Sequence, residues 1–104
     1  METLRNSIHK PTHPGEVLRE DVLPALGLTQ GEFAANLGVS RRTISEIIHE
    51  RRPVTPDMAI RLAKFLGNGP GIWLRMQQAL DLWELTHGKN VKRYQKIKPL
   101  KIAA

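Results

Sequence analysis

Apolar residues recur at every third or fourth position along most of this 104-residue chain. That spacing is typical of amphipathic helices, each of which buries one face in a shared core. Glycines and other breaks divide the pattern into five short segments. The segments begin at Pro14, Thr29, Ser40, Thr55 and about Pro70, and they end at Gly27, Gly38, Arg51, Gly67 and Gly88. The pattern therefore predicts an all-α fold of five short helices.

Residues that favour helix starts support these boundaries. Thr29 is followed three residues later by Glu32, which is the capping-box pattern. Ser40 and Thr55 have the side chains of N-cap residues for the third and fourth helices. Pro24 lies inside the first segment, and we expect regular helix to stop just before it or to be distorted there.

The second and third helices are joined by a very tight turn, which is the arrangement of a helix-turn-helix between Gln30 and His49. Ala34 is small, as two closely crossing helices require, and Gly38 can adopt the positive φ that the turn needs. We expect Val39 to pack the turn onto the core. The residues expected to hold both helices on the domain are Phe33, Leu37, Ile44 and Ile47. An ordinary helical hairpin could share part of this pattern, but the combination favours DNA reading.

The third helix presents hydrogen-bonding groups on the face opposite its apolar residues. Arginine can bind O6 and N7 of guanine in the major groove, and glutamate can accept from N4 of cytosine. The N-terminal residues of such a helix reach base edges. The candidate DNA-binding residues of this helix are Ser40, Arg41, Arg42, Thr43, Ser45, Glu46 and His49.

Basic residues beyond the third helix have different expected roles. Arg51 and Arg52 follow it directly. We expect them to contact DNA phosphates; the alternative is that they belong to a solvated turn. Arg61 and Lys64 lie on the fourth helix, and we expect them to be plain surface residues.

The net charge of +6 is confined to the C-terminal end of the chain. Residues 1–87 contain 10 basic and 10 acidic side chains, whereas residues 88–104 contain 6 basic side chains and no acidic one. Such a tail suits a polyanion such as nucleic acid, or it is a solvated end that aids solubility. We therefore expect a flexible segment (1–12), a helix-turn-helix domain (13–87) and a basic tail (88–104) that forms a short edge strand or stays disordered.

Composition excludes several classes of protein. The chain has no cysteine, so disulfides and thiolate metal sites are excluded. The N-terminus lacks the apolar run of a secretory signal, and no stretch approaches the roughly 20 apolar residues that span a bilayer. These features predict a cytoplasmic protein without membrane contact.

Nothing in the sequence predicts a metal site, a cofactor or a catalytic centre. His9 and His13 are four residues apart, but no further ligand completes a site and Pro11 disfavours a helix between them. We expect His13 to cap or pack at the start of the first helix instead. No nucleophile–base pair, paired carboxylates or phosphate-binding glycine loop is present, so the chain is not expected to be an enzyme.

The fifth helix carries apolar residues on more than one side, which indicates a second packing partner besides its own core. Two tryptophans stand out in a chain with five aromatic residues. Core packing is the simple interpretation, but the width of the apolar surface predicts a dimer interface on this helix. The residues expected to form it are Trp73, Leu80 and Trp83.

The segment from Gln30 to His49 resembles the helix-turn-helix of the Cro/phage-repressor (XRE) family. Other stretches narrow the resemblance to the HigA antitoxins, also called the VapI or virulence-associated protein I group. These stretches are His13-Pro14-Gly15-Glu16, Pro53-Val54-Thr55-Pro56 with Ala59-Ile60-Arg61-Leu62-Ala63, and Trp73-Leu74-Arg75-Met76-Gln77 with Asp81-Leu82. The resemblance covers about residues 13–85.

The resemblance implies a homodimeric repressor of its own operon that also neutralises a HigB-type toxin, an mRNA-cleaving ribonuclease. It also implies that Gln30 contacts phosphate, and that Arg41, Arg42 and Glu46 face base edges. Thr43 and Ser45 would lie near phosphates or bases. The operator would be an inverted repeat with half-sites about 10 bp, or a multiple of that, apart.

The charge distribution departs from what an antitoxin would use against a basic toxin, because the body is neutral and the tail is basic. One alternative is therefore a solitary XRE-family regulator without a toxin. Another is a protein-interaction module that uses the helical scaffold without DNA, and neutralisation of Arg41 and Arg42 distinguishes it from a DNA-binding protein.

Overall fold

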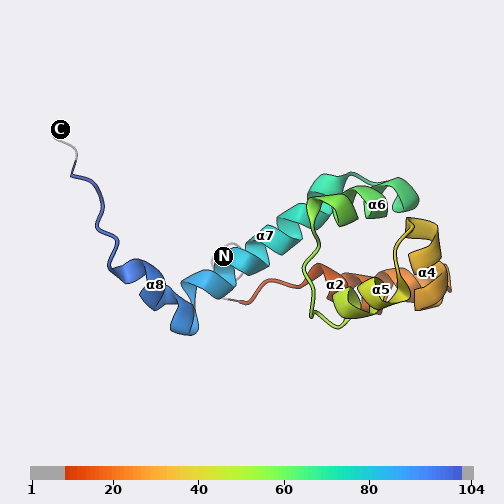
Figure 1. The fold of residues 1–104 in the computed structure, drawn as a ribbon, viewed down its shortest axis with the longest axis horizontal. Helices are drawn as coiled ribbons and strands as arrows, with labels where there is room; N and C mark the ends of the chain where they lie inside the picture. The colour runs from red at the N-terminus through yellow and green to blue at the C-terminus, as the bar shows by residue number, and fades with distance from the viewer. Residues whose placement is uncertain (1–8, 102–104) are drawn as a thin grey trace.

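The computed structural model describes residues 9–101, and every regular element among them is helical (Figure 1). The elements are α2 (Pro14–Val17), η1 (Leu18–Val22), α3 (Leu23–Leu26), α4 (Gln30–Leu37), α5 (Arg41–Ile48), α6 (Pro56–Leu66), α7 (Pro70–Thr86), η2 (Gly88–Val91) and α8 (Lys92–Gln95). The predicted all-α fold is confirmed, and four of the five predicted helices correspond to α4, α5, α6 and α7. The remaining one, the first along the chain, corresponds to the continuous run of α2, η1 and α3.

Pro24 distorts this first helix but does not end it. The turn before it is a π-helix, in which the N–H of Leu23 donates to the carbonyl of Leu18, five residues earlier. A proline has no N–H to give, and its ring clashes with the carbonyl four residues earlier in an ordinary α-helix. The wider turn relieves that clash, so the helix continues to Leu26 and ends at Gly27, whose φ is 66°.

The predicted N-caps are present in the structure. Thr29 Oγ1 accepts from the N–H of Glu32 at 3.1 Å, and Glu32 Oε1 accepts from the N–H of Thr29 at 2.9 Å, so the capping box is complete. The hydrogen bond from the Thr29 N–H lowers the pKa of Glu32 below its ordinary value. Ser40 caps α5 by accepting from the N–H of Thr43 at 3.1 Å, and Thr55 caps α6.

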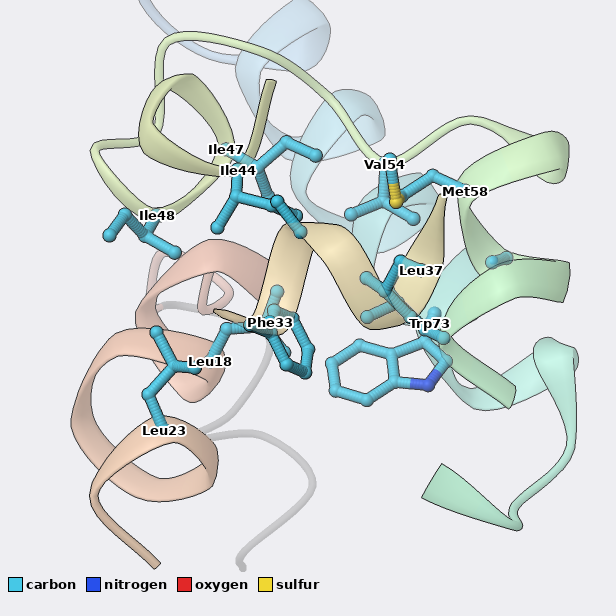
Figure 2. Packing of buried hydrophobic residues seen from close by; sticks show 13 residues of the cluster. Leu18, Leu23, Phe33, Leu37, Ile44, Ile47, Ile48, Val54, Met58 and Trp73 are labelled. Atoms are coloured by element: carbon cyan, nitrogen blue, oxygen red, sulfur yellow. The ribbon is translucent and has the colours of Figure 1, made fainter. Parts of the chain in front are cut away.

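The hydrophobic core lies where the first helix, α4, α5, α6 and the start of α7 meet. Figure 2 shows side chains from these elements pointing into one cluster. Phe33 of α4 is fully buried, and its ring meets the edge of Phe65 of α6 with centroids 5.8 Å apart. Ile44 and Ile47, on the inner face of α5, are also fully buried. The core therefore fixes α5 by one face and leaves the opposite face to solvent.

The segment between α5 and α6 is fastened to α7 by a buried glutamine. Gln77 is 6% exposed, and its Oε1 accepts from the N–H of Val54 at 2.8 Å. Its Nε2 donates to Asp81 Oδ1 at 2.9 Å, so both ends of the amide are paired. Because a buried amide is costly unless it is bonded, this pair sets the path of the chain after α5.

The C-terminal half of α7 projects away from the core and carries the tail with it (Figure 1). The described chain is elongated, with extents of 57 × 30 × 27 Å. The expectation of an edge strand or a disordered tail was wrong for residues 88–95, which form η2 and α8. The side-chain amide of Asn90 donates to the Glu84 carbonyl at 3.1 Å. This bond connects η2 to the end of α7.

The surface of α7 differs from the predicted dimer interface. Trp73 and Leu80 are each only 3% exposed, because they pack inside the protomer, so they offer no surface to a second copy. Trp83 is half-buried and remains available, and Leu82 beside it is 65% exposed. The periodicity correctly indicated apolar residues on two sides of α7. It could not distinguish the side that packs on the protomer's own core from the side that stays exposed.

Among residues 9–101, no helix is both long and apolar enough to cross a membrane.

Candidate nucleic-acid interface

The turn between α4 and α5 brings the two helices into close contact. Gly38 ends α4 with a φ of 72°, and the N–H of Val39 donates to the Ala34 carbonyl at 3.0 Å. Ala34 is 2% exposed, and a larger side chain there would push the helices apart. The predicted helix-turn-helix geometry is therefore present between α4 and α5.

Arg61 stabilises this turn from α6, which corrects the expectation that it is a plain surface residue. Its Nη1 donates to the Leu37 carbonyl at 2.9 Å and to the Gly38 carbonyl at 3.3 Å, and its Nε pairs with Asp57 at 2.9 Å. The last carbonyls of a helix have no partner within the helix, so a guanidinium is a suitable donor for them. The spacing of Asp57 and Arg61 along the chain indicates their local pair. It does not indicate the contacts of Arg61 with Leu37 and Gly38, which lie 24 and 23 positions earlier.

The inner side of α5 is fixed by a second close approach, which spacing along the chain does not reveal. Gly15 of α2 lies against the backbone of α5 so closely that a Cβ atom on it would be 1.8 Å from the Ile47 carbonyl oxygen. His13 holds the start of α2 in this position, because its Nδ1 accepts from the Gly15 N–H at 2.8 Å. The predicted capping role of His13 is thus confirmed, and Gly15 is required for close packing of α2 on α5.

Arg19 caps the C-terminal end of α5. Its Nη1 donates to the Ile48 carbonyl, and the same atom lies 3.4 Å from Glu50 Oε2. The neighbouring Glu20 carboxylate, which pairs with Arg19 Nε at 2.8 Å, raises the pKa of this guanidinium above its ordinary value. Arg19 therefore joins the first helix to the end of α5, a role that no sequence pattern indicated.

The backbone beyond α5 makes a Schellman turn. Glu50 has a φ of 62°, which non-glycine residues seldom adopt. The Glu50 N–H donates to the Ile47 carbonyl at 2.9 Å, and the Arg51 N–H donates to the Glu46 carbonyl at 2.8 Å. This turn folds the chain back, so that residues 51 and 52 lie beside the outer face of α5.

The outer face of α5 and the following turn form one basic surface, which we call the arginine face; it comprises Arg41, Arg42, Ser45, Glu46, Arg51 and Arg52. A shallow depression of about 460 Å³ is lined by all of these residues except Arg52. The side chain of Arg42 is 85% exposed. Within residues 9–101, neither Arg41 nor Arg51 makes an ion pair, so both guanidiniums have donors for a ligand.

Glu46 lies between two arginines of this face. Its Oε1 accepts from Nε and Nη2 of Arg52 at 2.9 and 2.5 Å, and its Oε2 accepts from Nε of Arg42 at 3.4 Å. The Arg52 hydrogen bonds hold the pKa of Glu46 below its ordinary value. The sequence suggested Glu46 as a base-contacting residue and Arg52 as a phosphate clamp, but it did not indicate that the two bind each other.

The remaining candidate residues lie around the arginine face with part of their hydrogen-bonding capacity in use. Ser40 and Thr43 are bonded to each other through their hydroxyls at 2.9 Å. His49 Nδ1 lies 2.7 Å from the Ser45 carbonyl oxygen. Gln30 is the first residue of α4, and Gly31 next to it approaches the Arg41 side chain, so the start of α4 adjoins the arginine face.

Among the residues that the structure describes, no three histidine, cysteine or carboxylate side chains are grouped to hold a metal ion. The residues that come together are instead donors for an anion. Arg42 and Arg52 pair with the Glu46 carboxylate, and Arg41 and Arg51 line the same exposed depression. Guanidinium forks match phosphate oxygens and the O6/N7 edge of guanine. The arrangement can therefore bind double-stranded DNA through its backbone and its major groove.

The family model that matches the chain is described as helix-turn-helix, and it matches residues 18–73. Virulence-associated protein I of Dichelobacter nodosus is 46% identical over 70 residues, which are 67% of this chain and 65% of that protein. Antitoxin HigA-1 of Vibrio cholerae is 36% identical over 97 residues, which are 93% of this chain and 90% of that protein.

Two solved structures of antitoxins with DNA have the same fold. Antitoxin GraA in complex with its operator superposes with a TM-score of 0.81 at 34% identity, covering 90% of this chain and 95% of that chain. Pseudomonas aeruginosa antitoxin HigA with the higBA promoter superposes with a TM-score of 0.79 at 31% identity, covering 88% of this chain and 99% of that chain.

Proposed function

The chain belongs to the helix-turn-helix family, in the group that includes the HigA-type antitoxins, and from this we propose that it is a sequence-specific repressor of its own operon. The observation that carries the proposal is the arginine face, which is exposed on α5 while the opposite face of α5 is locked into the core. This family consists of regulators and antitoxins, not of enzymes. The proposed function requires no cofactor and places the protein in the cytoplasm with its DNA.

In the proposed DNA complex, some residues contact bases and others contact phosphates. Arg41 and Arg42, at the start of α5, contact base edges in the major groove, as N-terminal residues of a recognition helix do. Arg51 and Gln30 contact phosphates on either side of the groove, which sets the register without reading sequence. The residues that complete the proposed contact set are Ser40, Thr43, Ser45, Glu46, His49 and Arg52.

We also propose that the protein acts as a homodimer through α7. The exposed Leu82 and half-buried Trp83 lie on the part of α7 that projects beyond the core, and apolar surface of this kind favours a partner. Two copies related by a twofold axis require an inverted-repeat operator. The centres of the half-sites would be about 10 bp, or a multiple of that, apart.

The antitoxin role extends the proposal to a second partner. Relatives named HigA and GraA are antitoxins, and one HigA structure contains the higBA promoter. We propose that this chain neutralises a HigB-type toxin, an mRNA-cleaving ribonuclease, encoded beside it. Co-expression with the adjacent short open reading frame, followed by co-purification, tests this role, and a toxin that is still active in the complex would reject it.

A second candidate is a solitary regulator without a toxin. The observation that favours it is charge: residues 1–87 are formally neutral and the tail is basic, so no acidic surplus is available for a basic partner. Failure to co-purify with any neighbouring gene product, together with specific binding to upstream DNA, would select this alternative.

The first experiment for the DNA-binding proposal compares two duplexes by fluorescence anisotropy, one from the region upstream of the gene and one scrambled. Phosphate contacts alone weaken strongly as salt rises, so the comparison is made at low and at physiological salt. We expect a preference for the upstream duplex of ~10³-fold or more at physiological salt, as for other specific repressors. Equal binding of both duplexes would reject an operator.

A further inference from the structure

The arginine face contains one acidic residue, and its position is opposite to what binding a polyanion would favour. Glu46 lies in the middle of the outer face of α5, and its side chain is 27% exposed between those of Arg42 and Arg52. Any DNA that meets this surface brings phosphates close to the carboxylate. Because like charges repel, Glu46 weakens the attraction between the face and any duplex that offers the carboxylate no donor.

The backbone holds Arg52 beside this carboxylate. The Schellman turn reverses the chain directly after α5, and Glu50 adopts its positive φ within that turn. Arg52 then places Nε and Nη2 on a single Glu46 oxygen, at 2.9 and 2.5 Å. Two donors on one charged acceptor make a strong contact for a surface pair, and these Arg52 hydrogen bonds lower the pKa of the carboxylate.

A guanidinium bound to a carboxylate has fewer donors for a phosphate. Arg52 can bind the DNA backbone fully only when it leaves Glu46, and Oε1 of Glu46, which accepts both Arg52 bonds, then needs another donor. The major groove offers such a donor as the N4 amino group of cytosine or the N6 amino group of adenine. Where the groove presents only O6 or O4 acceptors to Glu46, the carboxylate is left facing acceptors and the exchange is unfavourable.

We infer that Glu46 is a specificity-determining residue that withholds Arg52 from phosphate unless the base that faces the carboxylate is cytosine or adenine, whose amino group can donate to it. The inference rests on the proposed DNA-binding function and adds a physical basis for rejecting non-operator DNA. In this account Glu46 adds little affinity for the operator. Its effect is to lower affinity for sequences that place guanine or thymine opposite it.

The test is the substitution Glu46→Gln, which keeps the shape of the side chain and removes its charge. Affinity for a scrambled duplex is measured by fluorescence anisotropy at physiological salt. One released guanidinium that gains a phosphate contact at an exposed site predicts a gain of about fivefold. Operator affinity stays equal or falls, so the ratio of operator to scrambled affinity falls about fivefold or more. Glu84→Gln, which makes the same charge change on α7, is the matched control.

A second substitution isolates the part played by Arg52. In an Arg52→Gln background, Glu46→Gln should raise affinity for the scrambled duplex much less than in the wild type, because Arg52 is absent and Glu46 holds only Arg42, through the longer contact at 3.4 Å. The same gain in both backgrounds, or a gain no larger than that of Glu84→Gln, would overturn the inference. An operator-to-scrambled ratio that is unchanged by Glu46→Gln would also overturn it.

These measurements separate the inference from the function on which it rests. If the wild type does not prefer its upstream DNA, the proposed operator binding fails, while the scrambled duplex still measures whether Glu46 restrains Arg52. If the wild type shows the preference and Glu46→Gln keeps it, only the inference about Glu46 fails.

Discussion

The guanidinium of Arg61 donates to the carbonyl oxygen of Leu37 at 2.9 Å, and this bond joins α6 to the end of α4 across 24 residues of sequence. It lies at the turn that sets the angle between α4 and α5. A residue on the surface of α6 therefore contributes to the geometry of the DNA-binding helices without lying on the arginine face.

We predict that Arg61→Ala destabilises the fold by roughly 1–2 kcal/mol, because it removes a charged donor from the part-buried hydrogen bond to the Leu37 carbonyl. Urea denaturation measures the change. Lys64→Ala is the matched control, since Lys64 is an exposed basic residue on the same helix, and it should stay within about 0.5 kcal/mol of the wild type. Equal effects of the two substitutions would contradict the capping role of Arg61.

Gly15→Ala should destabilise the protein and weaken DNA binding together. The added Cβ would meet the Ile47 carbonyl oxygen at 1.8 Å, so α2 and α5 must move apart. Overpacking of this kind costs roughly 1–3 kcal/mol, and a backbone obstacle favours the upper end. The control is Gly31→Ala, whose Cβ would lie 3.8 Å from the Arg41 side chain and which should be neutral or stabilising. A Gly15→Ala protein with wild-type melting temperature would show that this contact is not close.

Thr29→Ala should cost about 1 kcal/mol, the usual effect of losing an N-cap side chain. It also bears on pH dependence. Because the folded state lowers the pKa of Glu32, ionised Glu32 stabilises the fold above its ordinary pKa, and this contribution is lost as pH falls through the lowered value. Thr29→Ala keeps the backbone N–H that lowers the pKa of Glu32 most, so this pKa should rise only by the smaller part that the Thr29 side chain contributes, and stability should depend slightly less on pH in that acidic range. Denaturation between pH 2 and pH 7 with NMR titration of Glu32 measures both, and an unmoved pKa would refute the coupling.

Deletion of residues 92–104 should lower affinity equally for operator and scrambled duplexes. This segment begins with α8, at the end of the molecule away from α4 and α5 (Figure 1), and it carries five basic side chains. If these side chains bind phosphates, they add affinity without reading sequence, so the slope of log affinity against log salt should become less steep by ~0.9 for each phosphate that the shortened chain no longer neutralises. A changed ratio between the two duplexes would mean that the tail takes part in sequence recognition.

The features that could be predicted from the sequence depend on local geometry. The capping box of Thr29 and Glu32 and the turn at Gly38 are each determined by residues within a few positions, so composition and spacing are enough to indicate them. Apolar periodicity likewise predicted which face of α5 packs in the core. These local signals were sufficient for the helices and for the location of the candidate DNA-binding face.

The features that were missed depend on contacts between distant segments. Gly15 against Ile47 and Arg61 at Leu37 arise only when the helices pack, and each residue type has many other uses on a helix. The pairing of Glu46 with Arg52 needed the backbone reversal at Glu50, where nothing in the sequence marks a positive φ. Trp73 was assigned to a dimer interface because periodicity cannot distinguish one apolar side of a helix from another.

The most direct test of the proposed function is the reading of bases by Arg42, whose side chain is the exposed guanidinium near the start of α5. Wild type and Arg42→Ala are compared on a set of duplexes that carry every single base-pair change in one operator half-site. We predict that Arg42→Ala loses ~1–3 kcal/mol on the intact operator and loses discrimination at one base pair in that half-site, while other positions keep theirs. Uniform weakening over the whole set would contradict this prediction, because it would make Arg42 a phosphate contact and leave Arg41 as the one arginine of α5 proposed to read bases.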